Sequence, residues 1–473
     1  MDKTTRTQFD GRKALAHVEH LAVTIGPRLT GTPGEHAAAA YIEKTFKSFG
    51  LPARRQKFPV QTFDSARCRL AVQDGRKWRD VPIQPVGLSA STPAGGFTGE
   101  FYYADSGEPE YYSPEMAGKI VLVCGNIAPE NRYKLLAHKP RAIIFIEGGI
   151  SAEPARMNLR DEALEAFGNI PIGRMLHLDG VDIISKGLTT ARLTMVNTQR
   201  ASHCFNVIGE LTGTDCPDEI VVICGHYDTS RAITGASDNA GGTALVMELA
   251  RVLSAAGSKR TLRFIAFGGE ETGLQGSKHY ARELLKSDKR QRKNKTFNDK
   301  TDKTELMRHV LTFNVDVHGA ILGKGNFNYS GSEDLAAAVR LLARELGVAT
   351  GVQRGPMSSD GSSLAAIGIP ALQFARGGGT TAYLHSPLDD IRFVSAGGLE
   401  KAGRFSEVLL KRYVTTAAAM AFPREIPDEQ KADLEKYKVT IERAAGKARR
   451  PAGKRATTKA ARKPARKAKR RAG

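Results

Sequence analysis

Four short apolar runs between residues 219 and 374 each lead into residues with imidazole or carboxylate side chains. The runs are rich in β-branched and aromatic residues, which is typical of buried strands in a parallel α/β sheet. They occupy residues 219–224, 261–267, 310–315 and 369–374. After the first run, Leu245, Leu249 and Val252 recur at helical spacing within residues 243–253. The pattern therefore predicts strands that alternate with helices in a doubly wound sheet.

The polar residues lie where a parallel sheet forms its binding sites, at the carboxyl ends of strands. Asp238 lies in a Gly/Ser/Asn-rich turn before the expected helix, and His385 follows the fourth run through a glycine-containing loop. Any one of these residues alone would be interpreted as a strand cap or a partnered core residue. Together, two imidazoles, three carboxylates and a free acid match what two zinc ions roughly 3.5–4 Å apart require. The residues are His226, Asp238, Glu270, Glu271, Asp316 and His385, and a further acid, Asp228, lies two residues after His226.

These segments resemble the family of co-catalytic zinc aminopeptidases, which includes bacterial leucyl aminopeptidases and the glutamate carboxypeptidases. The similarity extends to residues 25–34, 206–209, 273–277 and 359–360, and the motifs occur in the family's order. The resemblance implies an α/β fold of the zinc exopeptidase type, with a doubly wound mixed sheet. It also implies two Zn²⁺ ions per chain.

The resemblance assigns the metal ligands residue by residue. Asp238 would bridge the two zinc ions. His226 and Asp316 would complete the coordination of one ion, and Glu271 and His385 would complete that of the other. A water between the two metals would then be the nucleophile.

Two further acids match catalytic positions of the family. Glu270 would be the general base, and Asp228 would hydrogen-bond the far nitrogen of the first imidazole and fix its tautomer. Asp360, Arg376 and Tyr383 are candidate substrate contacts. Each of these three could equally be a packing or surface residue, because the sequence departs from the family's pattern after Asp360.

Residues 63–199 interrupt the catalytic pattern with strand-like runs at 99–103, 119–123, 142–146 and 191–196. A structureless connection of this length would be implausible, so we predict an inserted β-rich domain. It resembles the protease-associated domain, which implies a role in covering the cleft and selecting substrates. The alternative is a stability or interface module. The catalytic domain would comprise residues 10–62 and 200–423, followed by a C-terminal helix at 424–446.

The end of the chain, residues 447–473, is unusually basic. It contains thirteen Lys and Arg residues and no acid, so it carries most of the net charge of +20. With no large apolar residue to bury, this tail is predicted to be disordered. It could bind nucleic acid or another polyanion, or it could be a solubilising extension. The candidate contacts are Lys454, Arg455, Arg462, Lys463, Arg466 and Lys467.

The leading hypothesis is a zinc-dependent aminopeptidase that acts on peptides. The alternatives are a carboxypeptidase of the glutamate carboxypeptidase type, or a non-catalytic or nucleic-acid-associated scaffold that retains the fold. The first residues contain no apolar signal segment and no run reaches 18 apolar residues, so we expect no membrane association and a cytoplasmic location. Export would follow if the start of the chain were misassigned.

Overall fold

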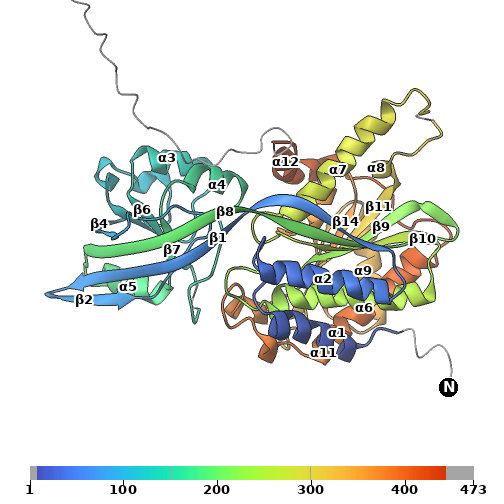
Figure 1. Ribbon diagram of the computed structural model, residues 1–473, viewed down its shortest axis with the longest axis horizontal. Helices are drawn as coiled ribbons and strands as arrows, with labels where there is room; N and C mark the ends of the chain where they lie inside the picture. The colour runs from blue at the N-terminus through green and yellow to red at the C-terminus, as the bar shows by residue number, and fades with distance from the viewer. Residues whose placement is uncertain (1–7, 150, 299, 444–473) are drawn as a thin grey trace, which may run out of the picture.

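The computed structural model describes residues 8–149, 151–298 and 300–443, which form two lobes side by side (Figure 1). The larger lobe contains most helices, and the smaller lobe is built around residues 63–199. Helix α12 spans Asp428–Arg443, within the predicted C-terminal helix. The predicted basic tail from Lys447 onward lies outside the described residues.

One hydrogen-bonded path of strands runs through both lobes in the order β13-β12-β14-β11-β9-β10-β8-β4-β5-β6-β7-β3. In the larger lobe, β9 pairs in parallel with both β10 and β11, β11 pairs in parallel with β14, and β12 pairs in parallel with β13. The pairs β12–β14 and β8–β10 are antiparallel. This mixed sheet confirms the predicted α/β fold class. Its strands are β9 Cys216–His226, β10 Arg260–Phe267, β11 His309–Asp316, β12 Lys324–Ser330, β13 Thr350–Arg354 and β14 Ala371–Gly377. The four predicted runs fall on β9, β10, β11 and β14.

Alternate residues of the central strands point to opposite faces of this sheet, as the pleat requires. On β9, Val221 and Ile223 pack into one apolar core, and Val222 and Cys224 pack into another. Helices α1, α2, α6, α9 and α11 cover the first face, and α7 and α10 cover the second. Helix α6 confirms the helix predicted at residues 243–253. The bounds are α1 Gly11–Glu19, α2 Pro33–Ser48, α6 Gly242–Ala256, α7 Gln275–Arg292, α8 Glu305–Arg308, α9 Glu333–Glu345, α10 Gly361–Ala365 and α11 Ala396–Leu410.

Two strands of 22 residues, β1 (Ala53–Asp74) and β8 (Thr190–Leu211), connect the lobes. They pair in antiparallel fashion along nearly their whole length, with one irregularity between Ser65 and Arg67. One end of β8 also pairs with β10 of the larger lobe, and the other end pairs with β4 of the smaller lobe. The lobes are therefore joined by a continuous ribbon, and positions 62/63 and 199/200 lie inside it.

The smaller lobe contains helices as well as strands. Its strands β4 to β7 pair in parallel, and β3 pairs with β7 in antiparallel fashion. The runs predicted at 99–103, 119–123 and 142–146 are confirmed as β4, β5 and β6. Its helices have only six to nine residues each, too short for a clear helical periodicity in the sequence. The bounds are β2 Lys77–Val81, β3 Ile83–Pro85, β4 Phe97–Tyr103, β5 Ile120–Cys124, β6 Ala142–Ile146, β7 Ile172–Met175, α3 Arg132–Ala137, α4 Asp161–Phe167 and α5 His177–Ser185.

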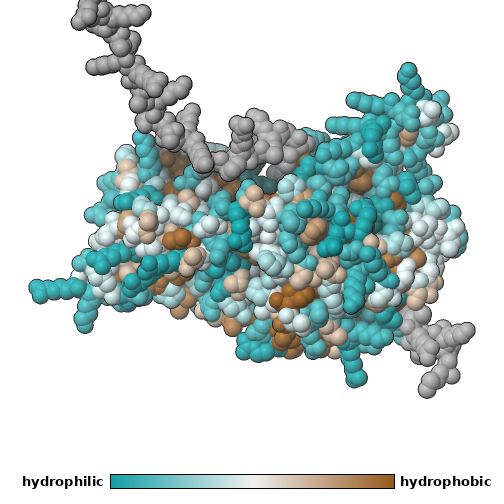
Figure 2. All heavy atoms as spheres, in the orientation of Figure 1, coloured by the Kyte–Doolittle hydropathy of each residue, from teal (hydrophilic) through white to brown (hydrophobic). Residues whose placement is uncertain are grey.

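The face of the molecule in Figure 2 is mainly hydrophilic, with apolar residues in small separate patches. Most large apolar side chains are instead buried in the cores on the two faces of each sheet. None of the helices in the described part of the chain combines the length and the apolar composition needed to cross a bilayer.

Candidate functional site

The seven residues singled out at strand ends come together at one edge of the larger sheet. His226 ends β9 and Asp316 ends β11. Glu270 and Glu271 follow β10, and His385 follows β14 through the loop after Gly377. These strands are mutually parallel, so their carboxyl ends meet at the same edge. The topology of the sheet thus explains why distant segments converge.

Asp238 lies between the two imidazoles. Its Oδ1 is 3.2 Å from Nε2 of His226, and its Oδ2 is 3.1 Å from Nε2 of His385. Nε2 of His226 is also 3.1 Å from Oδ1 of Asp316, and Nε2 of His385 is 3.5 Å from Oε2 of Glu271. The residues therefore form two groups, each able to hold one metal ion, and they share Asp238.

The backbone of Asp228 sets the tautomer of His226. Nδ1 of His226 lies 3.2 Å from the carbonyl oxygen of Asp228, whereas it lies 3.6 Å from the Asp228 carboxylate. A carbonyl only accepts hydrogen bonds, so Nδ1 carries a proton, and Nε2 is the nitrogen that faces the carboxylates of the first group. The sequence predicted a contact of this nitrogen with the Asp228 carboxylate, and the two also form a pair at 3.6 Å.

The carboxylate of Asp228 holds the adjacent glutamates. It accepts hydrogen bonds from the backbone N–H of Glu270 at 3.0 Å and of Glu271 at 3.3 Å. The hydroxyl of Thr30 donates to the same carboxylate at 2.8 Å. Asp228 is completely buried, so these bonds fix the path of the chain through the Glu-Glu pair.

Asp389 holds the turn that presents Asp238. Its carboxylate accepts from the backbone N–H and the hydroxyl of Ser237, at 2.8 and 2.7 Å, and from the N–H of Asp238 at 3.0 Å. The next side chain, Asn239, accepts from the N–H of Val317 and donates to the carbonyl of Val315. The turn is therefore tied both to the His385 loop and to the end of β11.

Arg28 holds backbone segments next to the site in place. It is completely buried, and its guanidinium donates to backbone carbonyls of Leu21, Gly26, Tyr227, Thr234 and Gly235. Burial lowers its pKa to about 10, which still leaves the side chain charged at neutral pH. These bonds connect the start of the chain to the residues on either side of Asp228 and to the loop before Asp238.

The charges of the cluster favour cations. Burial lowers the pKa of His385, but the carboxylates of Glu271 and Asp238 outweigh it and raise that pKa to about 9. Burial raises the pKa of Asp238, but hydrogen bonds from the two imidazoles outweigh it and hold the pKa far below its ordinary value. Burial also raises the pKa of Glu270 to about 8, against the attraction of Arg160. The carboxylates thus stabilise positive charge placed between them.

The donors of both groups suit zinc. Each group combines one imidazole nitrogen with carboxylate oxygens, and all of the side chains are buried or half-buried. Zinc in proteins takes nitrogen and oxygen ligands of this kind, and two-metal hydrolytic sites share a bridging group. Glu270 belongs to neither group, so its carboxylate is left free beside them.

Arg160 of the smaller lobe reaches into this cluster, which the sequence did not predict. Its Nη2 lies 3.4 Å from Oε2 of Glu270 and 3.2 Å from Oε2 of Glu271, and its Nη1 lies 3.5 Å from Oε1 of Glu270. Its Nε donates to the carbonyl of Glu271 at 3.1 Å. The side chain is 24% exposed, against 5% for Glu270 and 2% for Glu271. Arg160 is therefore the cation at the open side of the two glutamates.

The segment that carries Arg160 is anchored on the larger lobe by several other bonds. The N–H of Arg156 donates to the carbonyl of His385 at 2.8 Å, and the amide of Asn158 donates to the carbonyl of Glu271 at 3.0 Å. Buried Lys278 pairs with Asp161 at 2.6 Å. No local pattern in residues 151–161 signals this role, since it depends on how the lobes pack.

The other predicted contacts belong to neither of the two groups. Asp360 is completely buried, which leaves it no surface to present to a substrate. The ring of Tyr383 stacks on Phe393 with centroids 4.8 Å apart. Arg376 is the next-to-last residue of β14 and donates to the carbonyl of Ile321. The six basic residues predicted to bind polyanions, from Lys454 to Lys467, lie outside the described residues.

Comparison with known proteins agrees with this geometry. Residues 206–409, which contain all seven strand-end residues, match peptidase family M28. Aminopeptidase YwaD of Bacillus subtilis is 28% identical over 413 residues, which cover 84% of this chain and 83% of that protein. Carboxypeptidase Q of Bos taurus is 23% identical over 279 residues, which cover 55% of this chain and 59% of that protein.

Solved structures extend the similarity to both lobes. The structure of a zinc aminopeptidase from Bacillus subtilis superposes with a TM-score of 0.68 at 26% identity. The superposition covers 90% of this chain and 99% of that chain. Arg160 lies outside the family match at residues 206–409, in the lobe that the structural comparison includes. The convergent residues, the match of residues 206–409 to peptidase family M28 and the shared architecture show that this chain is an M28-like metallopeptidase.

Proposed function

We propose that the protein is a two-zinc aminopeptidase that removes N-terminal residues from peptides. The observation that carries this proposal is Asp238, which directs one carboxylate oxygen to His226 and the other to His385. Relatives named as aminopeptidases support the same activity. One group of ligands would be His226, Asp238 and Asp316, and the other would be Asp238, Glu271 and His385.

The remaining residues would perform the proton transfer. Two bound zinc ions would polarise the scissile carbonyl and lower the pKa of water. Glu270 is buried, belongs to neither ligand group and is held by Asp228 through its backbone N–H. Its carboxylate is therefore placed to take a proton from the attacking water and return it to the nitrogen of the leaving amine. The surplus of carboxylates would also favour the α-ammonium group of a peptide.

A carboxypeptidase is the alternative within the same family. It is favoured by the likeness to carboxypeptidase Q and by Arg160, a cation at the open side of the glutamates that could meet a terminal carboxylate. A non-catalytic scaffold is less well supported, because the complete set of ligand-type residues and the free acid converge at one site.

The first prediction tests the bridging role of Asp238. Asp238→Ala should lower the zinc content well below two per chain, because both groups lose an oxygen. Asp389→Ala should keep the ligands but loosen the turn, and weaken zinc binding by about 10- to 100-fold. Zinc content by atomic absorption after dialysis against graded chelator measures both. Asp390→Ala is the matched control and should bind zinc normally, since Asp390 pairs with Arg392 at the surface. Two tightly held zinc ions in Asp238→Ala would contradict the assignment.

The second prediction concerns proton transfer. Glu270→Gln should retain two zinc ions yet lower kcat by at least about a hundredfold, because the amide cannot accept the proton. Metal analysis and steady-state kinetics on one preparation check both statements. Near-normal turnover with full zinc occupancy would remove Glu270 from the mechanism.

The third prediction concerns Arg160. Arg160→Ala should lower kcat/KM by about 10- to 100-fold, because Glu270 and Glu271 lose their shared cation. Arg160→Lys should recover part of the loss, since a charge returns without the forked geometry. Arg156→Ala is the control from the same segment, because its guanidinium donates to the carbonyls of Arg231 and Ala232 and not to the glutamates. Equal losses in Arg156→Ala and Arg160→Ala would indicate a purely structural role.

The fourth prediction distinguishes the two peptidase activities. If the cluster receives the α-ammonium group, N-acetylation of a short peptide should lower kcat/KM by at least about a hundredfold. Amidation of its C-terminus should matter far less. Liquid chromatography of the products from the free, acetylated and amidated peptides measures this. The reverse order would support the carboxypeptidase alternative.

We also propose that the basic tail binds polyanions such as DNA. The support is its charge alone, thirteen Lys and Arg residues without an acid between Lys447 and Gly473.

We propose a cytoplasmic location as well. The five cysteines are all unpaired, which supports a reducing compartment such as the cytoplasm.

The fifth prediction tests the tail. Deletion after Gly446 should leave peptide turnover unchanged and abolish most DNA binding. Binding by the full chain should weaken by roughly 0.9 log unit per neutralised phosphate for each tenfold rise in salt. Fluorescence anisotropy with a labelled duplex over a salt series measures this. Equal binding by the truncated and full chains would show that the tail is a solubilising extension.

A further inference from the structure

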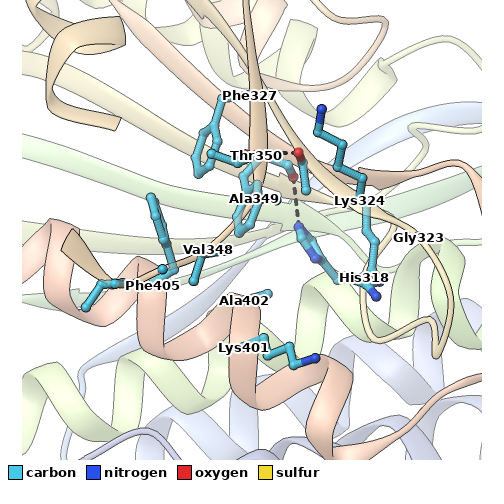
Figure 3. A pocket seen from close by; sticks show the side chains of 15 residues that line it. His318, Gly323, Lys324, Phe327, Val348, Ala349, Thr350, Lys401, Ala402 and Phe405 are labelled. Atoms are coloured by element: carbon cyan, nitrogen blue, oxygen red, sulfur yellow. Dashed lines mark hydrogen bonds between the residues drawn. The ribbon is translucent and has the colours of Figure 1, made fainter. Parts of the chain in front are cut away.

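A cavity of about 670 Å³ lies in the larger lobe (Figure 3). It is bounded by strands β12 and β14, by helix α11 and by residues 346–350, which lead into β13. None of the seven strand-end residues lines it. Its nearest connection to them along the chain is His318, two residues after Asp316. The cavity is therefore not a part of the proposed active site.

One wall of the cavity is aromatic. Phe327 of β12 and Phe374 of β14 stack with centroids 4.1 Å apart and an interplanar angle of 4°. Phe405 of α11 lies 5.4 Å from Phe327 and 6.0 Å from Phe374. All three rings are almost fully buried and all three line the cavity. This wall suits an apolar or aromatic side chain.

Three cations, Lys324, Arg376 and Lys401, line the same cavity, and no Asp or Glu does. Within the described part of the chain, none of the three forms an ion pair with a carboxylate. Nε of Arg376 is buried without a hydrogen-bond partner among the described residues. A concave surface with cations and no balancing acid attracts an anion.

His318 adds a hydrogen-bond acceptor. Its ring is buried, and Nε2 lies 3.1 Å from the carbonyl oxygen of Phe374, so Nε2 carries the proton. Nδ1 is buried and has no partner among the described residues. In the neutral tautomer that this hydrogen bond selects, Nδ1 is an acceptor. A ligand that fills the cavity should therefore bring an N–H or O–H donor as well as an anion.

We propose that this cavity binds an N-acylated apolar amino acid through its free carboxylate. The carboxylate would meet Lys324, Arg376 and Lys401, the side chain would lie against the phenylalanines, and the amide N–H would donate to His318. The C-terminal residue of a peptide has this chemistry, and so does a free acylated amino acid that acts as an effector. The volume of the cavity lies within the range of small-molecule sites, about 300–1,000 Å³.

The binding test uses N-acetyl-L-phenylalanine with the zinc-loaded full chain, measured by isothermal titration calorimetry. The acid should bind saturably, and N-acetyl-L-phenylalaninamide should bind at least tenfold more weakly. The double variant Lys324→Glu/Lys401→Glu should weaken binding of the acid at least tenfold. Lys44→Glu, a matched charge reversal on an exposed residue of α2, should not change it. Unchanged thermal unfolding of each variant establishes that it is folded.

Three results would overturn the proposal: equal binding of the acid and the amide, wild-type affinity in the double variant, or loss of binding when zinc is removed by chelation. The last result would mean that the probe binds the metals. Binding should instead persist in zinc-free protein and in Glu270→Gln. The test is thus independent of turnover, and failure of the proposed peptidase activity would leave it standing.

Kinetics on a peptide series then identifies the source of the ligand. If the occupant is the C-terminus of a substrate, the double variant should raise KM for peptides with a free carboxylate and not for their amides. This measurement rests on the proposed peptidase activity. If the occupant is a free acylated amino acid, KM should stay the same for both series while probe binding is lost.

Discussion

Repulsion among five carboxylates is the constraint on which the structure of this site depends. The acids belong to Asp228, Asp238, Glu270, Glu271 and Asp316, all nearly buried at one edge of the sheet. Like charges gathered away from water are costly unless cations or hydrogen bonds compensate them. Two zinc ions would offset four of the five negative charges, and Arg160 offsets the fifth. The strands and the Asp238 turn bring the carboxylates together, and the smaller lobe supplies the compensating Arg160.

Hydrogen bonds from outside the cluster keep its members in place. Asp228 accepts the backbone N–H groups of both glutamates, and Asp389 accepts those of Ser237 and Asp238. Each of these two acids is buried and is used as an acceptor for backbone donors. These bonds hold the chain segments at the site through groups that are not themselves proposed metal ligands. This preorganisation reduces the conformational freedom that metal binding would otherwise have to remove.

The sequence predicted that these residues would converge because their positions are coupled to a repeated local pattern. Each apolar run of β-branched residues specifies a buried strand, and parallel strands bring their carboxyl ends together, so His226, Glu271 and Asp316 could be grouped without a structure. The sequence also predicted that the Asp228 carboxylate would lie near His226. A spacing of two residues brings both the carbonyl and the carboxylate of Asp228 near the ring, and the additional carbonyl contact depends on a backbone path that the sequence does not specify.

Arg160 could not be predicted for a different physical reason. Its importance arises from the way the two lobes pack, and that packing depends on the β1–β8 ribbon and on contacts such as Lys278 with Asp161. The residues next to an arginine in the sequence do not show whether it lies on the open surface or, like Arg160, packs against acids of another lobe. The helices of the smaller lobe escaped prediction similarly, since six to nine residues give too few turns for periodicity to emerge.

The position of Arg160 also changes the role that the smaller lobe can have. A lobe that only covered the cleft would alter access to the site, whereas one that delivers a guanidinium to Glu270 and Glu271 alters the charge of the site itself. The two lobes are joined by one continuous antiparallel ribbon, so a small bend of that ribbon would move Arg160 relative to the glutamates. With two zinc ions bound, withdrawal of Arg160 would leave one uncompensated carboxylate charge, and Glu270 is the acid that no metal would neutralise. The geometry of the ribbon and the protonation of the proposed base are therefore physically coupled.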